Sequence, residues 1–168
     1  MQIVLYLIPL FLSIYPQEKS HSYDNAIKKL GNKTWVVYKE CLNDSCSMIN
    51  DNNYYLFHDA ARTYNNSDDT AYAGYSHFID HRNDSTGGFS YATCSTMICF
   101  YDAHTKKKDI FPIFVIGENY HGTGELQFAD DTHFILNTTS LSEDSLIVKR
   151  QEHYKLVPTP QEILDIEK

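Results

Sequence analysis

The stretch "LGNKTWVVYKEC", residues 30–41, contains the only tryptophan of the chain, Trp35. A β-branched and aromatic run follows Trp35, which is typical of a strand with a large buried side chain at its head. Before it, four residues follow the i, i+3, i+4, i+7 spacing of one helix face, namely Tyr23, Ala26, Ile27 and Leu30. Gly31 can end such a helix in the left-handed conformation. The sequence therefore predicts a short helix that leads directly into a first strand.

From the first strand onward the hydrophobic period is two, and clusters rich in Asn, Asp, Ser and Gly interrupt it. The expected strands are 34–40, 53–60, 71–81, 88–102, 110–116, 124–129, 132–138 and 145–151. Thr159 as a cap, Pro160 at the first helical position and a short apolar stripe after it predict a C-terminal helix. Many short strands favour a sandwich or a closed barrel.

The order of cysteines and tryptophan decides between these two architectures. An immunoglobulin sandwich needs a cysteine before the tryptophan, and no cysteine precedes Trp35. An up-and-down barrel removes every sheet edge and leaves an interior that can hold one small ligand. We therefore predict an all-β fold, an eight-stranded up-and-down antiparallel barrel with a short N-terminal helix and a C-terminal helix.

Length and charge narrow the classes of function. A chain of 168 residues suits one domain, which we place at residues 23–168. The net charge of −8 disfavours nucleic acid and anionic membranes as partners, because both require a basic surface. The paired C-x4-C spacing differs from the C-x2-C that is typical of zinc sites, so we expect no metal. We expect a monomer without a cofactor.

The N-terminal residues and the sequons indicate export. Residues 3–15 are almost wholly apolar but too short to span a bilayer, and we interpret residues 1–22 as a signal peptide. Five Asn-x-Ser/Thr sequons suggest surface glycans, at Asn32, Asn43, Asn65, Asn83 and Asn137. We therefore expect a secreted, extracellular glycoprotein.

Four cysteines in an exported chain predict two disulfides, formed by Cys41, Cys46, Cys94 and Cys99. If residues 94–99 form one strand, the Cα atoms of Cys94 and Cys99 lie about 16 Å apart at ~3.3 Å per residue. A disulfide needs Cα atoms within about 7 Å. This geometry excludes a Cys94–Cys99 bridge, and with two disulfides it excludes Cys41–Cys46 as well. We then expect both bridges to tie the loop after the first strand to the middle strand, whereas a tight turn at 95–97 would reverse this conclusion.

A short helix followed by Gly-x-x-x-Trp at the head of the first strand resembles the lipocalin entry motif, although the usual form is Gly-x-Trp. The segment "YDNAIKKLGNKTWVVYKECLNDS" resembles the tick salivary lipocalins of the histamine-binding group, as does "GELQFADDTHFILNTT" at residues 124–139. The positions that match the pattern of that group are Ala26, Lys28, Leu30, Asn43 and Asp44.

The resemblance implies a secreted barrel in tick saliva that sequesters a host mediator and thereby aids evasion of host defence. Asn25 and Ile27 stand where the family has the Asp and Trp of an amine site. The resemblance therefore does not imply an amine site at this helix. The late Cys-x-Leu-Trp of the family and its C-terminal cysteines are also absent, so the disulfide pattern must differ.

A Phe-x-Asp triplet occurs four times near predicted strand ends, at residues 57–59, 78–80, 100–102 and 128–130. Phe and Asp of one triplet share a face of a strand, so an inward face would combine aromatic rings with a carboxylate and suit a cationic amine. The alternative interpretation is that each Asp opens a turn by bonding the backbone. For the amine, the first candidate carboxylate is Asp59, with Tyr55 and Phe57; the second is Asp80, with Phe78 and Tyr72.

The sequon at Asn137 predicts the orientation of one strand. A glycosylated Asn137 points outward, so Phe134 and Leu136 point inward. Together with Trp35 at the closed end, these side chains complete the predicted ligand-binding set.

No enzyme motif has its full pattern, and we expect no catalysis. The leading hypothesis is a secreted protein that binds a biogenic amine, such as histamine or serotonin, or a lipid, such as a leukotriene or sterol. The alternative is an immunomodulator that binds a host protein through its surface.

Overall fold

The structure, a computed structural model, describes residues 23–49, 53–58, 70–82, 87–101, 109–117, 120–141 and 146–167. The predicted signal peptide lies outside these residues, as do Asp59, Asn65 and Asn83. Within the described ranges, neither helix combines the length and the apolar character needed to cross a bilayer.

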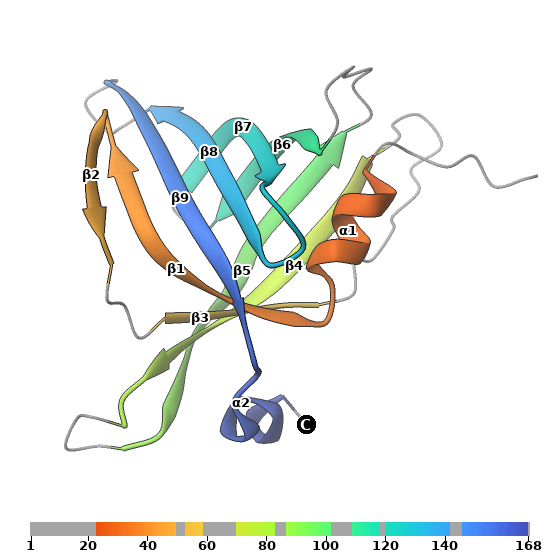
Figure 1. Ribbon diagram of the computed structural model, residues 1–168, viewed down its shortest axis with the longest axis vertical. Helices are drawn as coiled ribbons and strands as arrows, with labels where there is room; N and C mark the ends of the chain where they lie inside the picture. The colour runs from red at the N-terminus through yellow and green to blue at the C-terminus, as the bar shows by residue number, and fades with distance from the viewer. Residues whose placement is uncertain are drawn as a thin grey trace, which may run out of the picture.

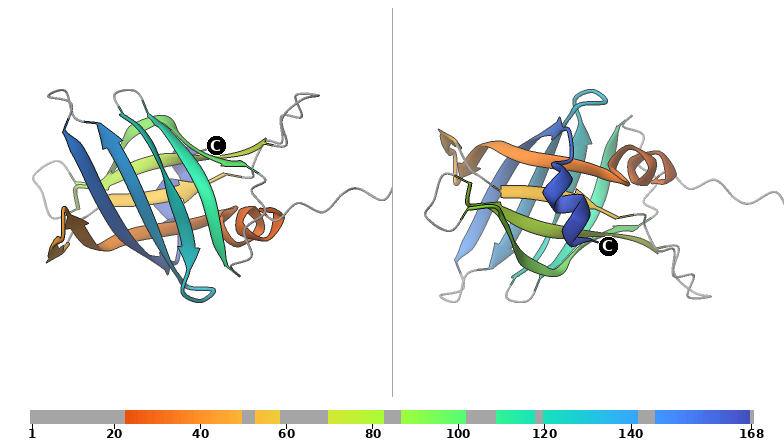
Figure 2. Two further views of the ribbon diagram at one scale, coloured as in Figure 1. Left: turned by 90° about the horizontal axis from the view of Figure 1, so that it is seen from above. Right: turned by 90° about the horizontal axis from the view of Figure 1, so that it is seen from below.

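Nine strands and two helices occur in the described residues. In chain order they are α1 (Asp24–Leu30), β1 (Lys33–Leu42), β2 (Ser45–Met48), β3 (Asn53–Phe57), β4 (Thr70–Asp80), β5 (Phe89–Tyr101), β6 (Ile110–Gly117), β7 (Tyr120–Phe128), β8 (His133–Leu141), β9 (Ile147–Val157) and α2 (Gln161–Ile166). β1 and β3 to β9 form a closed antiparallel barrel in which β9 returns to pair with β1 (Figures 1 and 2). The predicted eight-stranded barrel with a helix at each end of the chain is confirmed.

Apolar side chains on the inner faces of the strands build the core. α1 lies across one end of the barrel (Figure 1), and its buried residues join the same cluster as Trp35. Lys29 fixes the helix there, with its Nζ 3.2 Å from Asp131, 3.5 Å from Asp109 and 5.0 Å from the ring centre of Phe128. Burial lowers the pKa of Lys29, but the bond to Asp131 and the charge of Asp109 outweigh it, so that the pKa is raised. This end of the barrel is closed.

The ends of the two helices differ in detail from the expectation. Gly31 has an extended backbone, with φ −59° and ψ 142°, and Asn32 instead takes the left-handed conformation at φ 55°. Thr159 does not cap α2, because its hydroxyl bonds the hydroxyl of Thr34 at 2.8 Å. α2 packs on the outside of the barrel through Ile163.

The cysteines pair differently from the prediction. Cys41 and Cys46 lie opposite each other on β1 and β2 and form a disulfide, so the predicted bridges to the middle strand are wrong. The segment expected to be a loop is a tight hairpin, with Asn43 at φ 46° and Asp44 at φ 72°, as in mirror-image hairpin turns. β5 is continuous through the two later cysteine positions, as predicted, and Cys99 is free and buried. The prediction was wrong because it assumed that all four cysteines form disulfides, whereas Cys99 is free.

Candidate functional site

The strands β8 and β9 show which side chains point into the barrel. Phe134 and Leu136 are buried in the core cluster, as the sequon at Asn137 predicted. In the β8–β9 register, Phe134 lies opposite Tyr154 and Leu136 lies opposite Glu152. Opposite residues in an antiparallel pair share a face, so Glu152 and Tyr154 also point inward.

Aromatic rings surround Tyr154 inside the barrel. The ring of Phe134 stacks on Tyr154 at 4.4 Å between centroids, and Tyr55 meets Tyr154 edge-on at 5.6 Å. Trp35 packs edge-on against Phe134 at 4.8 Å, and Phe57 lies 6.1 Å from Phe134. The structure thus brings together five predicted site residues: Trp35, Tyr55, Phe57, Phe134 and Leu136.

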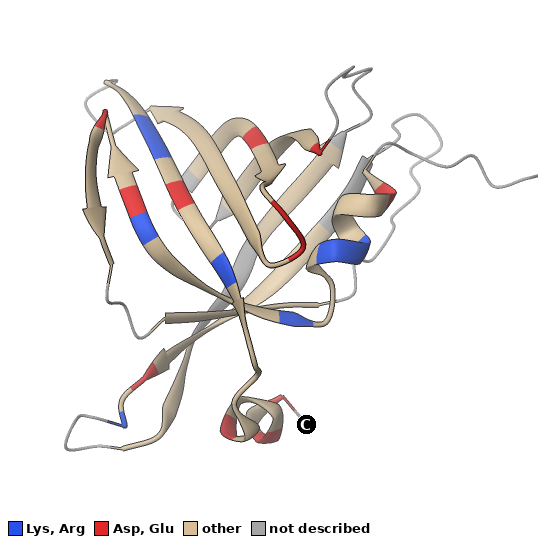
Figure 3. Ribbon diagram, in the orientation of Figure 1, with Lys and Arg blue, Asp and Glu red and all other residues tan. Residues whose placement is uncertain are grey.

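Three charged residues lie beside these rings, on the neighbouring strands β1 and β9 (Figure 3): Glu40, Arg150 and Glu152. Glu40 and Glu152 are opposite each other in the β1–β9 register, although a bulge interrupts the pairing at Tyr38. Arg150 Nε is 2.7 Å from Glu40 Oε1 and so compensates that carboxylate. Glu152 forms no ion pair with a basic side chain in the part of the chain that the structure describes; instead Tyr154 donates a 3.3 Å hydrogen bond to Glu152 Oε2.

Burial dominates the electrostatics of this group. It raises the pKa of Glu152; the charge of Arg150 acts in the opposite direction, and the charge of Glu40 adds to the rise. Burial also raises the pKa of Tyr154 well above its ordinary value, and the neighbouring Glu152 contributes. The phenol therefore remains a hydrogen-bond donor at neutral pH. Two carboxylates and one guanidinium leave a formal charge of −1 beside the aromatic rings.

The inward-facing residues of β9 become more exposed toward the end of the barrel opposite α1. Along the inward-facing residues of β9, the exposed fraction falls from 44% at the Arg150 side chain to 3% at Tyr154. Glu152, between them, is half-buried. The exposure of the inward-facing residues of β9 therefore increases toward the end that carries Arg150. His77 stacks on Tyr55 at 4.8 Å and its Nε2 lies 2.6 Å from Asn53 Oδ1.

Two predicted site residues are not in the barrel interior. Phe78 packs with Leu56 and Ile163 in a separate cluster beneath α2, on the outer face of β3 and β4. Asp80, which shares this face, is held by the guanidinium of Arg82, whose Nη2 is 2.6 Å from Oδ2. The prediction that they line the cavity is wrong, because the residues of β4 that pack in the barrel core are Ala73 and Tyr75.

The alternative interpretation of the Phe-x-Asp triplets is confirmed where the structure describes it. The backbone N–H of Arg82 donates to Asp80 Oδ1 at 2.9 Å, and that of Thr132 donates to Asp130 Oδ1 at 2.6 Å. Both carboxylates therefore open turns. Hydrogen bonds from Thr132 lower the pKa of Asp130 to about 2. Asp59 and Asp102 lie outside the described residues.

Sequence reasoning missed Glu152 and Tyr154. The last strand was expected to end at residue 151, whereas β9 continues to Val157. The signal was present, since the inward orientation of Phe134 and Leu136 and a hairpin register between the last two strands would have placed both residues inside. Three charged residues near the middle of the segment, Lys149, Arg150 and Glu152, obscured the alternation.

The barrel is compatible with a lipocalin-like fold and with the binding of a small ligand. No model of a known protein family matches the chain, and no curated protein matches its sequence.

Proposed function

We propose that the protein binds a small amine, such as histamine or serotonin, inside its barrel and sequesters it without chemical change. The observation that carries the proposal is Glu152, an inward-facing carboxylate without an ion pair among the described residues, beside the rings of Tyr154 and Tyr55. Withdrawing a carboxylate from water is costly unless a positive charge compensates it, and Glu152 is already half-buried. The ammonium group of an amine would supply that charge, and the rings would hold its aromatic body.

The expected pose follows from the arrangement of groups. The ammonium pairs with Glu152, which has no ion pair among the described residues, whereas Glu40 is bonded by Arg150. The aromatic part of the ligand contacts Tyr55 and Tyr154, where stacking and cation–π attraction both act. Trp35 and Phe134 form the floor below them. Tyr154 supports the site by donating its hydroxyl to the same carboxylate.

We also propose that the protein acts outside the cell. The Cys41–Cys46 disulfide supports this location, because disulfides persist in oxidising compartments. The resemblance to the salivary lipocalins points to a host mediator as the ligand.

Isothermal titration with histamine and with serotonin tests the proposed function. Glu152→Gln keeps the shape of the side chain and removes its charge. We expect it to weaken amine binding about 30-fold or more, because truncating one partner of a buried charge pair costs roughly 2–5 kcal/mol. Glu125→Gln is the matched control: this exposed carboxylate lies on the outer face of β7 and its loss should leave the affinity unchanged.

Two results would contradict the proposal. One is equal amine affinity of the Glu152→Gln variant and the native protein. The other is the absence of heat from either amine together with displacement of a bound fatty-acid probe, which would establish lipid binding. An analogue with a hydroxyl in place of the ammonium should bind the native protein weakly.

A further inference from the structure

A groove of about 470 Å³ lies over β1, β2 and β7 to β9, lined mainly by outward-facing residues, with Thr138 and Arg150 of the inner face also at its border. Its lining follows one cross-strand row, from Glu125 on β7 through Asn137 and Gln151 to the Cys41–Cys46 disulfide. Thr139 and Lys149 border the row. Volumes of about 300–1,000 Å³ are typical of sites that hold small molecules. The groove is thus large enough for a sugar residue.

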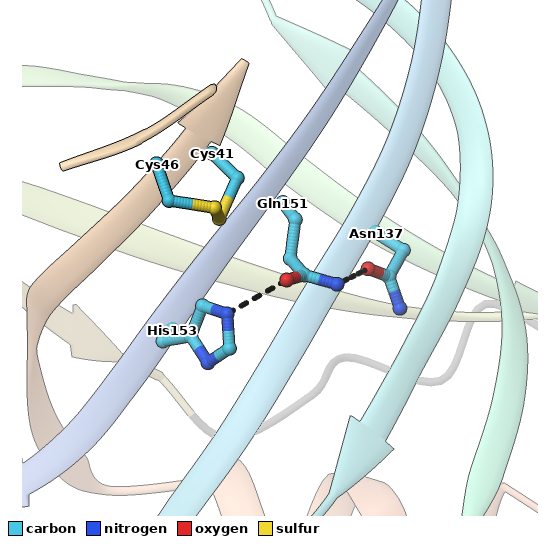
Figure 4. Close-up of a disulfide and its surroundings, with 5 residues drawn as sticks. All are labelled: Cys41, Cys46, Asn137, Gln151 and His153. Carbon is cyan, nitrogen blue, oxygen red and sulfur yellow. Dashed lines mark hydrogen bonds between the residues drawn. A yellow bond between two sulfur atoms is a disulfide. The ribbon is translucent and has the colours of Figure 1, made fainter. Parts of the chain in front are cut away.

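Hydrogen bonds orient the amide of Asn137 within this groove (Figure 4). His153 Nε2 lies 2.8 Å from Gln151 Oε1, and Gln151 Nε2 donates to Asn137 Oδ1 at 2.7 Å. The side-chain oxygen of Asn137, Oδ1, therefore already accepts a hydrogen bond from Gln151. The side-chain nitrogen, Nδ2, points away from Gln151 in Figure 4. Nδ2 is the atom that carries a glycan in a modified asparagine.

We propose that Asn137 carries an N-linked glycan whose first sugar lies in this groove. Asn137 begins an Asn-Thr-Thr sequon whose hydroxyl residue is Thr139. In the transfer, Nδ2 forms a bond to C1 of the sugar of a lipid-diphosphate-linked oligosaccharide. The bond from C1 to the phosphate oxygen breaks, the lipid diphosphate leaves, and the amide loses one proton.

The chemistry of the groove suits a seated sugar. The hydroxyl of Thr139, the ammonium of Lys149 and the carboxylate of Glu125 can bond the hydroxyl and acetamido groups of the sugar. Because Asn137 uses only its oxygen toward Gln151, the modification leaves the existing hydrogen bond intact.

Asn43 provides an internal comparison. It is the sequon asparagine of the β1–β2 turn and it is exposed; the groove lining reaches the next residue, Asp44, but not Asn43. Its Oδ1 likewise accepts a bond, from the backbone N–H of Lys149 at 2.9 Å. A glycan at Asn43 would therefore project into solvent, whereas the glycan at Asn137 would be partly covered.

The test uses the full chain, secreted from eukaryotic cells and digested with peptide N-glycosidase in its native state. Site-specific mass spectrometry follows the release of each glycan. We expect release at Asn137 to be at least about tenfold slower than at Asn43, because the enzyme must wait for local opening. After denaturation the two rates should be equal. An unmodified Asn137 in the secreted protein, or native release as fast as at Asn43, would overturn the proposal.

A second measurement separates the glycan from the side chains. Thr139→Ala removes the sequon and leaves Asn137 and Gln151 in place, whereas Thr139→Ser keeps the sequon. In the secreted protein we expect Thr139→Ala to melt about 2–4 °C below Thr139→Ser. In a chain of this size, such a shift in melting temperature corresponds to the loss of about 1 kcal/mol of stability. In bacterially produced protein, which lacks the glycan, the two variants should melt together. An equal difference in both hosts would refute a seated glycan.

Discussion

Replacing Trp35 with alanine should remove the largest side chain from the closed end of the barrel. Trp35 is fully buried and packs 4.8 Å from Phe134 between ring centroids. Aromatic side chains bury about 150–250 Å² each, which at about 25 cal/mol per Å² corresponds to roughly 4–6 kcal/mol as an upper bound. Alanine keeps part of this contact, so we expect the free energy of unfolding to fall by about 3–5 kcal/mol.

Trp35→Phe gives the matched comparison. Its smaller ring loses packing, but it also removes the indole Nε1, which has no hydrogen-bond partner among the described residues. An unpaired buried donor costs about 1–3 kcal/mol, so the net loss for Trp35→Phe should be only about 1–2 kcal/mol. Urea unfolding followed by far-ultraviolet circular dichroism measures both variants, because they lack the only tryptophan as a fluorescent probe. A loss below about 1 kcal/mol for Trp35→Ala, or equal losses for both, would refute the reasoning.

Three further variants test other features of the barrel. Gly124→Ala places a Cβ against the backbone carbonyl oxygen of Asn137, so the backbone must shift, and it should cost about 1–3 kcal/mol or more in urea unfolding. Replacing Cys41 and Cys46 with serine should cost about 2 kcal/mol, since the bridge spans only five positions, with a near-native circular dichroism spectrum; complete unfolding would contradict this. Because burial raises the pKa of Glu152, the stability of the ligand-free protein should fall as pH rises from the unfolded pKa through the folded one, and Glu152→Gln should lack that component.

The closed barrel was predictable because its main signals are local. Period-two alternation and turn clusters located the strands, and the spacing of Tyr23, Ala26 and Leu30 located the helix that closes one end. The parity argument from Asn137 correctly oriented β8. These features depend on residues close together in the sequence, and each is enforced by burial of one face.

The site was harder to predict because it depends on register between strands. Asp80 was assigned to the interior from its spacing to Phe78, but α2 covers that face of β4 and makes it a second, outer cluster. Glu152 was missed because the segment around it carries charges on both faces of the strand. The Cys41–Cys46 bridge was excluded because we assumed that all four cysteines form two disulfides. In the structure the two residues lie directly across a tight hairpin.

The polar interior of β9 breaks the pattern that folds the rest of the barrel. On β8 the inward positions are Phe134, Leu136 and Thr138, whereas their partners on β9 include Glu152 and Arg150. Such local violations in an otherwise consistent sequence are expected at functional sites, where stability is given up for binding. Arg150 forms an ion pair with Glu40, and its charge acts only partly on Glu152, which has no ion pair among the described residues. A glutamine at this position would keep the shape of the side chain without a carboxylate to desolvate, and this difference is what the proposed positively charged ligand explains.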